Sequence, residues 1–463
     1  MSGEFIARKL SRRSLIKATA AATGALVLGA CAPQASPTTA PTVAPAANPT
    51  TAPTSAPTAV PAPKEKVTVT WWHALSGSWG EFLKGYVQSF NDSQSAVTVK
   101  AESQGSYNDL RDKYAAGVAA NTVPEVVAHS DMAFPAFARN GALEALDDLA
   151  KGPNGLDMAD YFGVVDRGKI NGKLYQLPLG VSTPIFYCNP DMLKAAGLSG
   201  TPKTWDDLFE TYMPKTTVKE GSKTKIYGFS FLANADWWWQ QSYAWMYGGK
   251  LSDDEWNTYF DSPEVIDFLT RFQKAFQAGQ AYIPTSADGG AKGYFASGFA
   301  AMMVESTGVL ASIDGLTKDK FKAEVGYMPQ GPKGRMVPTG GNGLSVSAKL
   351  AASRRDAAWE FVRWTQQPDQ IVAFDKATGY LTYTKKSSDK MADFLASNPR
   401  YKVAVDQMAW SRPQSNIQTI PRAANIYFDA MLQVFQGGKD PKTLMPEVQK
   451  QVQAILKEEG LKK

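Results

Sequence analysis

Few residues of this 463-residue chain could act together as a catalyst or as a set of metal ligands. The chain has two histidines, His73 and His129, and it contains neither a His-x-x-x-His pair nor an acidic calcium-binding loop. The loop Gly340–Gly343 lacks the lysine of a phosphate-binding loop, and no Gly-x-Ser-x-Gly nucleophile motif occurs. We therefore predict no metal, no cofactor and no catalytic residue.

Acidic and aromatic side chains could instead bind a ligand rich in hydroxyl groups. Asp131 follows a short apolar run at the point where a strand would end. A carboxylate there could accept hydrogen bonds from hydroxyl groups, although the first residue of a helix would look the same. The cluster Trp237-Trp238-Trp239 offers rings on which the apolar faces of sugars stack. We expect at least one of these rings to face a cleft and the others to fill a core.

The segments around Asp131 alternate between strand-like and helix-like patterns. Short apolar or alternating runs predict three strands, and helical spacing of apolar residues predicts two helices between them. The expected strands are Val67–Trp71, Val97–Val99 and Pro124–Ala128, and the expected helices are residues 78–91 and 107–120. We expect residues 72–77, which include His73, to form a loop. This order predicts a parallel sheet with ligand sites at the carboxyl ends of its strands.

The rest of the chain predicts a second body of the same class. A chain of 463 residues is too long for one compact core, so we expect two lobes. Strand patterns near Tyr227–Leu232 and Ala300–Val304 belong to the second lobe. Three segments marked by glycine or proline are expected to cross between the lobes: Ser182–Pro184, Val337–Gly341 and Thr378–Leu381.

The stretch Gln176–Leu198, with TPKTWDDLFE soon after it, resembles the extracellular solute-binding proteins (family 1) of ABC importers, including their glycerol-3-phosphate and sugar binders. WWHALSG, STGVLASI and ATGYL extend the resemblance in the same order along the chain. The resemblance implies an α/β fold of the two-lobed periplasmic-binding-protein type (type II), with two doubly wound lobes joined by hinge crossings. It assigns residues 64–183 plus 337–378 to lobe one and residues 184–336 plus 379–463 to lobe two.

The resemblance also implies a ligand-binding site. The matching positions are an acid after a strand, a tyrosine in Gly-x-Tyr, a serine before Thr-Pro, a serine that opens a helix, the second glycine of a crossing and the tyrosine of Thr-Gly-Tyr-Leu. In this sequence they are Asp131, Tyr107, Ser182, Ser306, Gly341 and Tyr380. Trp237 and Trp238 lie where relatives place stacking tryptophans.

One position departs from the family pattern. The glycerol-3-phosphate binder has an arginine three residues after a proline near its C-terminus, whereas this chain has Ala424 there. Arg422, two residues away, is the nearest substitute for a phosphate contact. The departure favours a neutral sugar or oligosaccharide, with glycerol-3-phosphate or a glycerophosphodiester as the alternative.

Residues 1–30 are typical of a lipoprotein signal peptide. Ser11–Lys17 matches the twin-arginine pattern, and the apolar stretch after it is too short to span a bilayer. The run Leu28–Cys31 resembles the bacterial lipobox, in which the cysteine carries lipid and becomes the N-terminus. Residues 31–63 comprise this Cys31 and a tether rich in proline, threonine and alanine.

The net charge of +5 gives no reason to expect nucleic-acid binding, because residues 1–30 carry five basic residues against one acidic residue and leave +1 for the rest. We predict a non-enzymatic monomer, anchored by lipid on the outer face of the cytoplasmic membrane. It would capture a carbohydrate between its lobes and deliver it to the transmembrane permease of an ABC importer with its cytoplasmic ATPase. The alternatives are an exported glycoside hydrolase, which a suitably spaced carboxylate pair would favour, and a structural surface protein.

Overall fold

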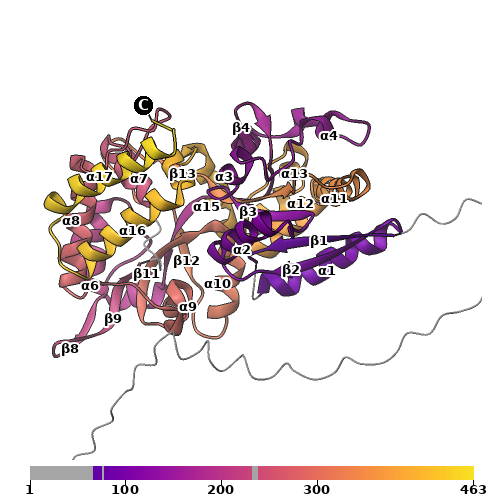
Figure 1. The fold of residues 1–463 in the computed structure, drawn as a ribbon. Helices are drawn as coiled ribbons and strands as arrows, with labels where there is room; N and C mark the ends of the chain where they lie inside the picture. Colours follow the sequence, from indigo (N-terminus) through magenta and orange to yellow (C-terminus); the bar gives the residue numbers. More distant parts are fainter. Residues whose placement is uncertain (1–65, 76–77, 232–237, 463) are drawn as a thin grey trace, which may run out of the picture. The chain divides into compact units, whose positions relative to one another are not determined.

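The computed structural model describes residues 66–75, 78–231 and 238–462. The chain divides into two units, Met1–Ala62 and Pro63–Lys463, and the described residues lie in the second (Figure 1). The predicted signal peptide, Cys31, the tether and Trp237 lie outside the described residues. Among the helices of the described part, none is long and apolar enough to cross a membrane.

The first sheet has five strands in the order β2-β1-β3-β14-β6. They are β1 (Val67–His73), β2 (Val97–Ser103), β3 (Val126–Ser130), β6 (Leu177–Ser182) and β14 (Gly340–Val346). β1 pairs in parallel with β2 and β3, and α1 (Ser78–Ser93) and α2 (Tyr107–Ala120) connect these strands. The predicted β-α-β-α-β order is therefore present.

Two expectations about this sheet need correction. The sheet is mixed rather than parallel, because β14 returns along the chain from the second sheet and pairs antiparallel with β3 and β6. His73 does not lie in a loop, because β1 continues beside β2 and pairs His73 with Ser103. The His73 side chain is buried and accepts a hydrogen bond at Nδ1 from the Leu75 amide, and burial lowers its pKa to about 4.

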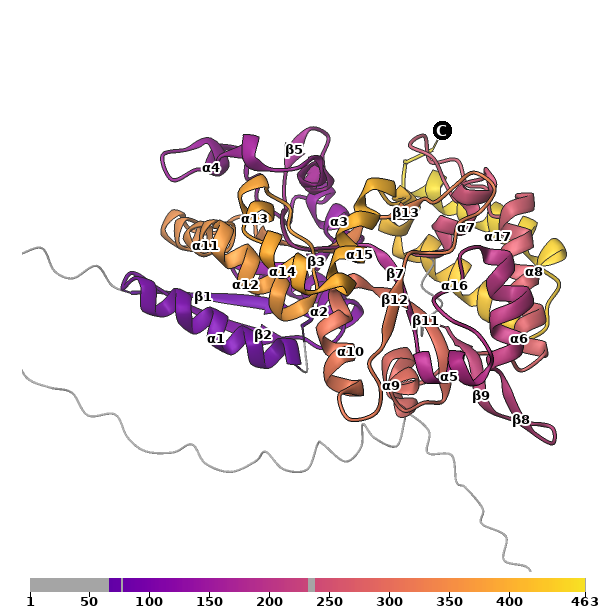
Figure 2. The ribbon, with the colours of Figure 1, turned by 180° about the vertical axis from the view of Figure 1, so that it is seen from behind.

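The second sheet has the order β10-β9-β11-β7-β12, with β8 paired to β9. Its strands are β7 (Pro184–Cys188), β8 (Val218–Glu220), β9 (Lys223–Ser230), β10 (Ala281–Tyr282), β11 (Ala300–Ser306) and β12 (Glu324–Gly326). Figure 2 shows a group of helices beside it: α7 (Gln240–Tyr247), α8 (Pro263–Gln277), α16 (Pro421–Phe435) and α17 (Pro441–Glu458). One hydrophobic core unites this sheet with these helices, and the fully buried Trp205 and Trp239 belong to it.

The two sheets are linked by short stretches of extended chain. A single residue, the buried Thr183, separates β6 of the first sheet from β7 of the second. Its carbonyl accepts a hydrogen bond from the Thr307 amide at 3.0 Å, and its hydroxyl accepts one from Gln407 Nε2 at 2.9 Å. The chain returns through β13 (Val337–Pro338) into β14. A third stretch, after α12 (Pro368–Thr378), contacts the end of β6 beside the first link, where Leu381 bridges to Val181.

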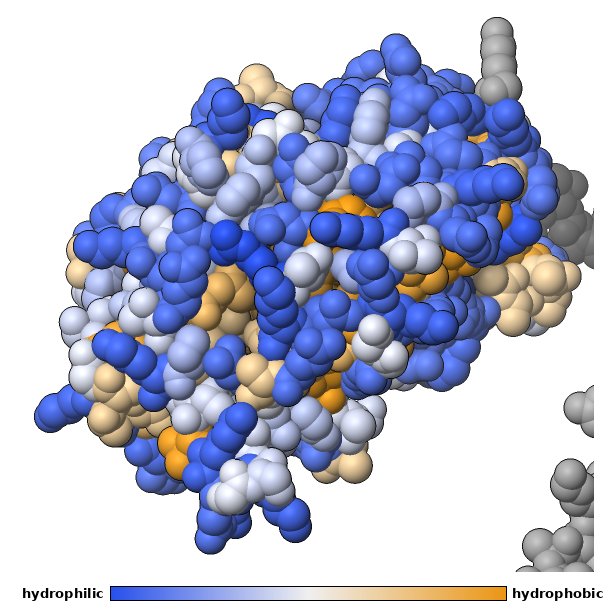
Figure 3. Space-filling model, turned by 90° about the vertical axis from the view of Figure 1, so that its left-hand side faces the viewer, coloured by the Kyte–Doolittle hydropathy of each residue, from blue (hydrophilic) through white to orange (hydrophobic). Residues whose placement is uncertain are grey.

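The surface of one face is mainly polar. In Figure 3, hydrophilic residues cover most of the face shown, and apolar residues appear as small areas between them. This distribution agrees with the burial of the large aromatic residues in the cores of the two sheets.

Candidate ligand-binding site

A cavity of about 280 Å³ is lined by residues from both sheets and from the links between them. Its volume lies just below the range of roughly 300–1,000 Å³ that is common for small-molecule sites. Seven of the predicted ligand-binding residues lie in the described part of the chain. All seven line this cavity: Tyr107, Asp131, Ser182, Trp238, Ser306, Gly341 and Tyr380. The structure thus brings together residues that are up to 273 positions apart in the sequence.

Two tyrosines that line this cavity form a hydrogen-bonded cluster with the buried amide of Asn342. Asn342 Nδ2 donates hydrogen bonds to Tyr107 Oη at 2.8 Å and to Tyr380 Oη at 3.2 Å, and the two hydroxyls are 3.4 Å apart. Both hydroxyls accept from Asn342 and at most one donates to the other, so one O–H proton remains for a ligand. Burial raises the pKa of Tyr107 and of Tyr380, so both stay protonated donors at neutral pH.

Local packing fixes these tyrosines. Tyr107 begins α2, where Ser106 caps the helix in a reciprocal capping box with Asp109. The Tyr380 ring lies against the backbone of Gly180 and Gly308, where added Cβ atoms would come within 2.8 and 2.6 Å of the ring. Only glycine permits this approach.

Asp131, directly after β3, is not a free carboxylate. Arg167 Nη1 lies 3.0 Å from Asp131 Oδ2, and Arg167 Nη2 donates to Asp131 Oδ1 at 3.3 Å. Arg167 Nη1 also donates to the Gly340 carbonyl at 2.9 Å. Burial raises the pKa of Asp131, and the positive charge of Arg167 opposes that rise.

Two more charged side chains line the cavity, one from helix α9 and one from strand β11 of the second sheet. Lys292, on α9 (Gly290–Ala296), places Nζ 5.7 Å from the centre of the Trp79 ring. Glu305, near the end of β11, accepts a hydrogen bond from the Ser306 amide at 2.8 Å. Burial raises the pKa of Glu305, and the charge of Lys292 opposes that rise. The cavity therefore combines hydroxyl, aromatic and charged groups.

Of the tryptophan cluster, Trp238 lines the cavity and Trp239 is fully buried in the core. The Trp238 indole nitrogen donates to the Thr339 carbonyl at 3.0 Å. A Cβ atom at Gly340 would come within 2.5 Å of the Trp238 ring, so the ring lies directly on the backbone of the link. Ser306 caps the short turn Thr307–Val309, its hydroxyl accepting from the Gly308 amide at 3.1 Å.

The structure does not bring Arg422 to this cavity, which corrects the prediction of a phosphate contact. Arg422 lies on the exposed face of α16 and pairs with Glu458 at 2.9 Å and Glu459 at 3.5 Å. Ala424 is buried in the core of the second sheet. The helix that starts at Pro421 turns these neighbouring residues to opposite faces, so neither reaches the cavity.

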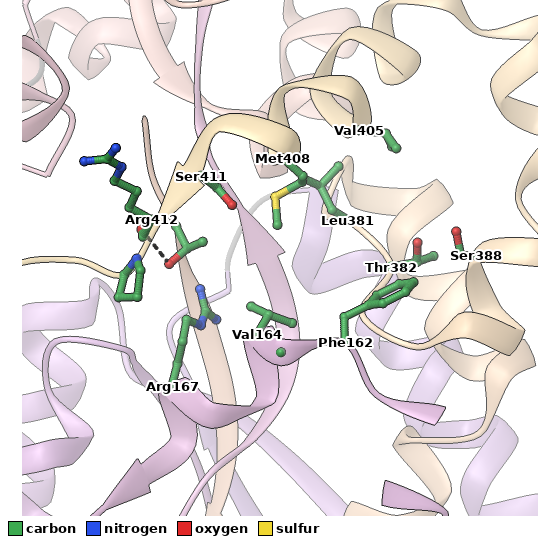
Figure 4. A pocket seen from close by; sticks show the side chains of 13 residues that line it. Phe162, Val164, Arg167, Leu381, Thr382, Ser388, Val405, Met408, Ser411 and Arg412 are labelled. Atoms are coloured by element: carbon green, nitrogen blue, oxygen red, sulfur yellow. Dashed lines mark hydrogen bonds between the residues drawn. The ribbon is translucent and has the colours of Figure 1, made fainter. Parts of the chain in front are cut away.

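A larger cavity of about 440 Å³ lies next to the first and is lined mainly by apolar residues (Figure 4). Phe162, Val164 and Met408 point into it in the figure. Arg167 also lines it and connects it to Asp131 in the smaller cavity. Despite its size, it contains none of the predicted site residues, so the smaller cavity is the better candidate.

The sequence did not indicate four residues that lie in or beside this cavity: Arg167, Asn342, Trp79 and Lys292. Arg167 belongs to no motif, and only the fold brings it to Asp131, 36 positions earlier. Asn342 is the one side chain with an amide in the glycine-rich run Gly340–Gly343, and a polar residue in such a link could have been noticed. Trp79 and Lys292 lie on helices whose orientation the local sequence does not reveal.

Known proteins resemble the chain over most of its length. Residues 85–403 match the model of a family described as bacterial extracellular solute-binding protein. The sn-glycerol-3-phosphate-binding periplasmic protein UgpB of Brucella abortus (strain 2308) is 28% identical over 424 residues, which cover 84% of this chain and 93% of that protein.

Solved structures resemble it as well. The structure of UgpB from Mycobacterium tuberculosis in complex with glycerophosphocholine has a TM-score of 0.78 and 28% sequence identity, and the match covers 85% of this chain and 99% of that one. The GacH receptor of Streptomyces glaucescens shares the fold, with a TM-score of 0.75 at 20% identity over 85% of this chain and 99% of that one.

Proposed function

Because the chain belongs to the bacterial extracellular solute-binding proteins, we propose that it captures a hydroxyl-rich solute in the smaller cavity and delivers it to the permease of an ABC importer. The observation that carries the proposal is the convergence of seven predicted residues on one cavity. The tyrosine hydroxyls and the Asp131 carboxylate suit hydroxyl groups, and the Trp238 ring suits the apolar face of a sugar. We propose a binding role without catalysis, for a protein that acts as a monomer.

We propose a carbohydrate as the ligand class. Among the described residues that line the cavity there is no arginine, and the guanidinium of Arg167 beside it is occupied by Asp131 and Gly340. A glycerophosphodiester is the second candidate, and it is favoured by Lys292 in the cavity wall and by the ligand of the Mycobacterium tuberculosis relative.

We propose two lobes that close over the solute, with residues 64–183 plus 337–378 as lobe one and residues 184–336 plus 379–463 as lobe two. The distribution of the strands between two sheets supports this division, since the chain leaves the first sheet at Thr183 and returns to it at β14. The links at Thr183, Val337–Gly341 and Thr378–Leu381 would then serve as hinges.

A thermal-shift screen tests the proposed function. A ligand that binds only the folded state raises the melting temperature by mass action, so sugars, polyols and their phosphates can be compared directly. If no sugar, polyol or glycerophosphodiester raises the melting temperature, the proposed ligand class is wrong.

Replacing Asp131 with alanine is expected to weaken binding of the best ligand at least tenfold, about 1.4 kcal/mol. Hydrogen bonds to a charged group contribute roughly 1.5–3 kcal/mol each, and the variant removes the carboxylate that would accept them. Calorimetry measures the change. Asp92→Ala, at an exposed position near the end of α1, is the control that should bind like the parent. Parent-like affinity of Asp131→Ala would place the ligand elsewhere.

We propose that residues 1–30 direct export and that a lipid on Cys31 anchors the protein to the outer face of the cytoplasmic membrane. Replacing Cys31 with serine is expected to move most of the protein from the membrane fraction to the soluble fraction, because serine cannot form the thioether. Immunoblots of fractionated cells measure this. The control is Cys188→Ala, a change at a buried thiol that should leave the anchor intact. A Cys31→Ser protein that stays in the membrane fraction would contradict the proposal.

A further inference from the structure

Arg167 connects the proposed ligand acceptor to the link between the sheets. It lies in the 3-10 helix Gly163–Gly168, and its guanidinium contacts both oxygens of Asp131 and the carbonyl of Gly340. The side chains of Arg167 and Asp131 are only 13% and 11% exposed. The Asp131 amide in turn donates to the Gly341 carbonyl at 3.3 Å. Asp131 is thus held at its backbone and at its carboxylate by groups that meet at the start of β14.

This geometry matters because a carboxyl group is a strong acceptor at both oxygens only while it is ionised and correctly oriented. Removal from water favours the neutral acid, which offers an O–H in place of an acceptor. A guanidinium that contacts both oxygens favours the ionised form and fixes the plane of the carboxylate. A carboxylate has about four lone-pair sites, so the contacts with Arg167 leave sites for hydroxyl groups in the cavity.

We propose that Arg167 is a positioning residue, which holds the Asp131 carboxylate in the orientation that accepts hydrogen bonds from the ligand. This inference rests on the proposed function of the smaller cavity. Arg167 acts from the wall of the larger cavity and does not line the smaller one, so its effect on the ligand passes through Asp131.

The other titratable groups near Asp131 are few. Tyr107 at the start of α2 and Tyr380 after α12 face it, and burial keeps both hydroxyls protonated. Lys292 of α9 and Glu305 of β11 line the same cavity. His129 of β3 is stacked on Phe137 and its pKa is lowered to about 3, so it stays neutral at the pH values of the test. Arg167 is therefore the cation that contacts Asp131.

The first test needs no ligand. In protein labelled with 13C at aspartate carboxyls, the Asp131 signal is identified by its loss in Asp131→Asn. Replacing Arg167 with glutamine is expected to raise the midpoint of Asp131 titration by one pH unit or more, a tenfold change in proton affinity. Arg422→Gln, which removes an exposed arginine, should leave the midpoint unchanged. An unchanged midpoint in Arg167→Gln would overturn the inference.

The second test measures binding, with maltose and glycerophosphocholine as separate probes. Arg167→Gln is expected to weaken the probe that binds the parent at least tenfold at a pH below the Asp131 midpoint that the first test gives for this variant, and to recover part of the affinity at a pH above that midpoint, where Asp131 ionises again. A merely structural defect would not recover with pH. Parent-like affinity would overturn the inference, and so would equal weakening at the pH values below and above that midpoint.

Arg167→Lys keeps the positive charge but lacks the planar guanidinium fork. It therefore separates the effect of the charge on the ionisation of Asp131 from the effect of the fork on its orientation. It also serves as the test variant if Arg167→Gln does not fold. Its Asp131 midpoint should stay close to that of the parent, while its affinity for the probe falls at both pH values. Parent-like affinity would show that orientation by the fork is not needed. If neither probe binds the parent, the proposed function is in question, and the titration of Asp131 alone still decides the role of Arg167.

Discussion

Replacing Gly341 with alanine should destabilise the protein by about 3 kcal/mol or more. Gly341 has a φ angle of +132°, a conformation that residues with a side chain rarely adopt. A Cβ atom there would overlap the carbonyl oxygen of Gly180 on the neighbouring strand β6. Both groups belong to the backbone of a paired sheet, so neither can move aside without breaking hydrogen bonds between β14 and β6.

Urea unfolding of Gly341→Ala and of a matched glycine variant would measure this effect. Gly315, on α10 (Leu310–Thr317), is exposed and has open space around its missing Cβ. Gly315→Ala should therefore leave stability unchanged or raise it by roughly 0.5–1 kcal/mol, since glycine is unfavourable within a helix. A Gly341→Ala protein as stable as the parent would mean that β14 does not pass β6 in the way described.

Much of the fold follows from local patterns in the sequence. The apolar runs before Asp131 predicted strands and helices that the structure contains as β1, α1, β2, α2 and β3. The prediction of a two-lobed α/β fold of the type II periplasmic-binding-protein class is confirmed by the solved structures that the chain resembles. Local patterns could not show that β14 inserts between β3 and β6, because this pairing joins residues more than 150 positions apart in the sequence.

The candidate site was predictable only where a motif marked it. Tyr107, Asp131 and Tyr380 stand in short motifs, and the structure places them on one cavity. Arg167 carries no such signal, since an isolated arginine in a polar turn usually faces solvent. The predicted phosphate contact of Arg422 failed for the opposite reason. Arg422 lies close in the sequence to the position of the family arginine, but the helix turns its side chain to the surface.

The second large effect concerns Asp375, an acid that the proposed function does not use. Asp375 lies on α12 and is completely buried. Neither of its carboxylate oxygens has a hydrogen-bond partner among the described residues. Burial raises its pKa well above the ordinary value for an aspartate. The folded protein must therefore keep this carboxyl group protonated at pH values where the unfolded chain would release the proton.

A raised folded pKa makes stability fall as pH rises. The contribution of Asp375 is fully present below the unfolded pKa, near 3.9, and is lost towards the folded pKa at about 1.4 kcal/mol per pH unit. Asp375→Asn removes this loss because an amide has no proton to release. Relative to the parent, the variant should gain stability as the pH rises above 4, by about 1.4 kcal/mol per pH unit until the folded pKa of Asp375 is reached. Urea unfolding at each pH measures the difference.

The comparison of variant with parent isolates Asp375 from the other buried groups. The buried His129 and His73 have pKa values lowered to about 3 and about 4, so they reduce stability as pH falls below about 6.5. Because both proteins contain these histidines, their effect cancels in the difference. Asp319→Asn, at an exposed position after α10, is the matched control and should show a difference that does not vary with pH. A pH-independent difference for Asp375→Asn as well would mean that water or another group reaches Asp375 and that its carboxyl group is ionised in the folded protein.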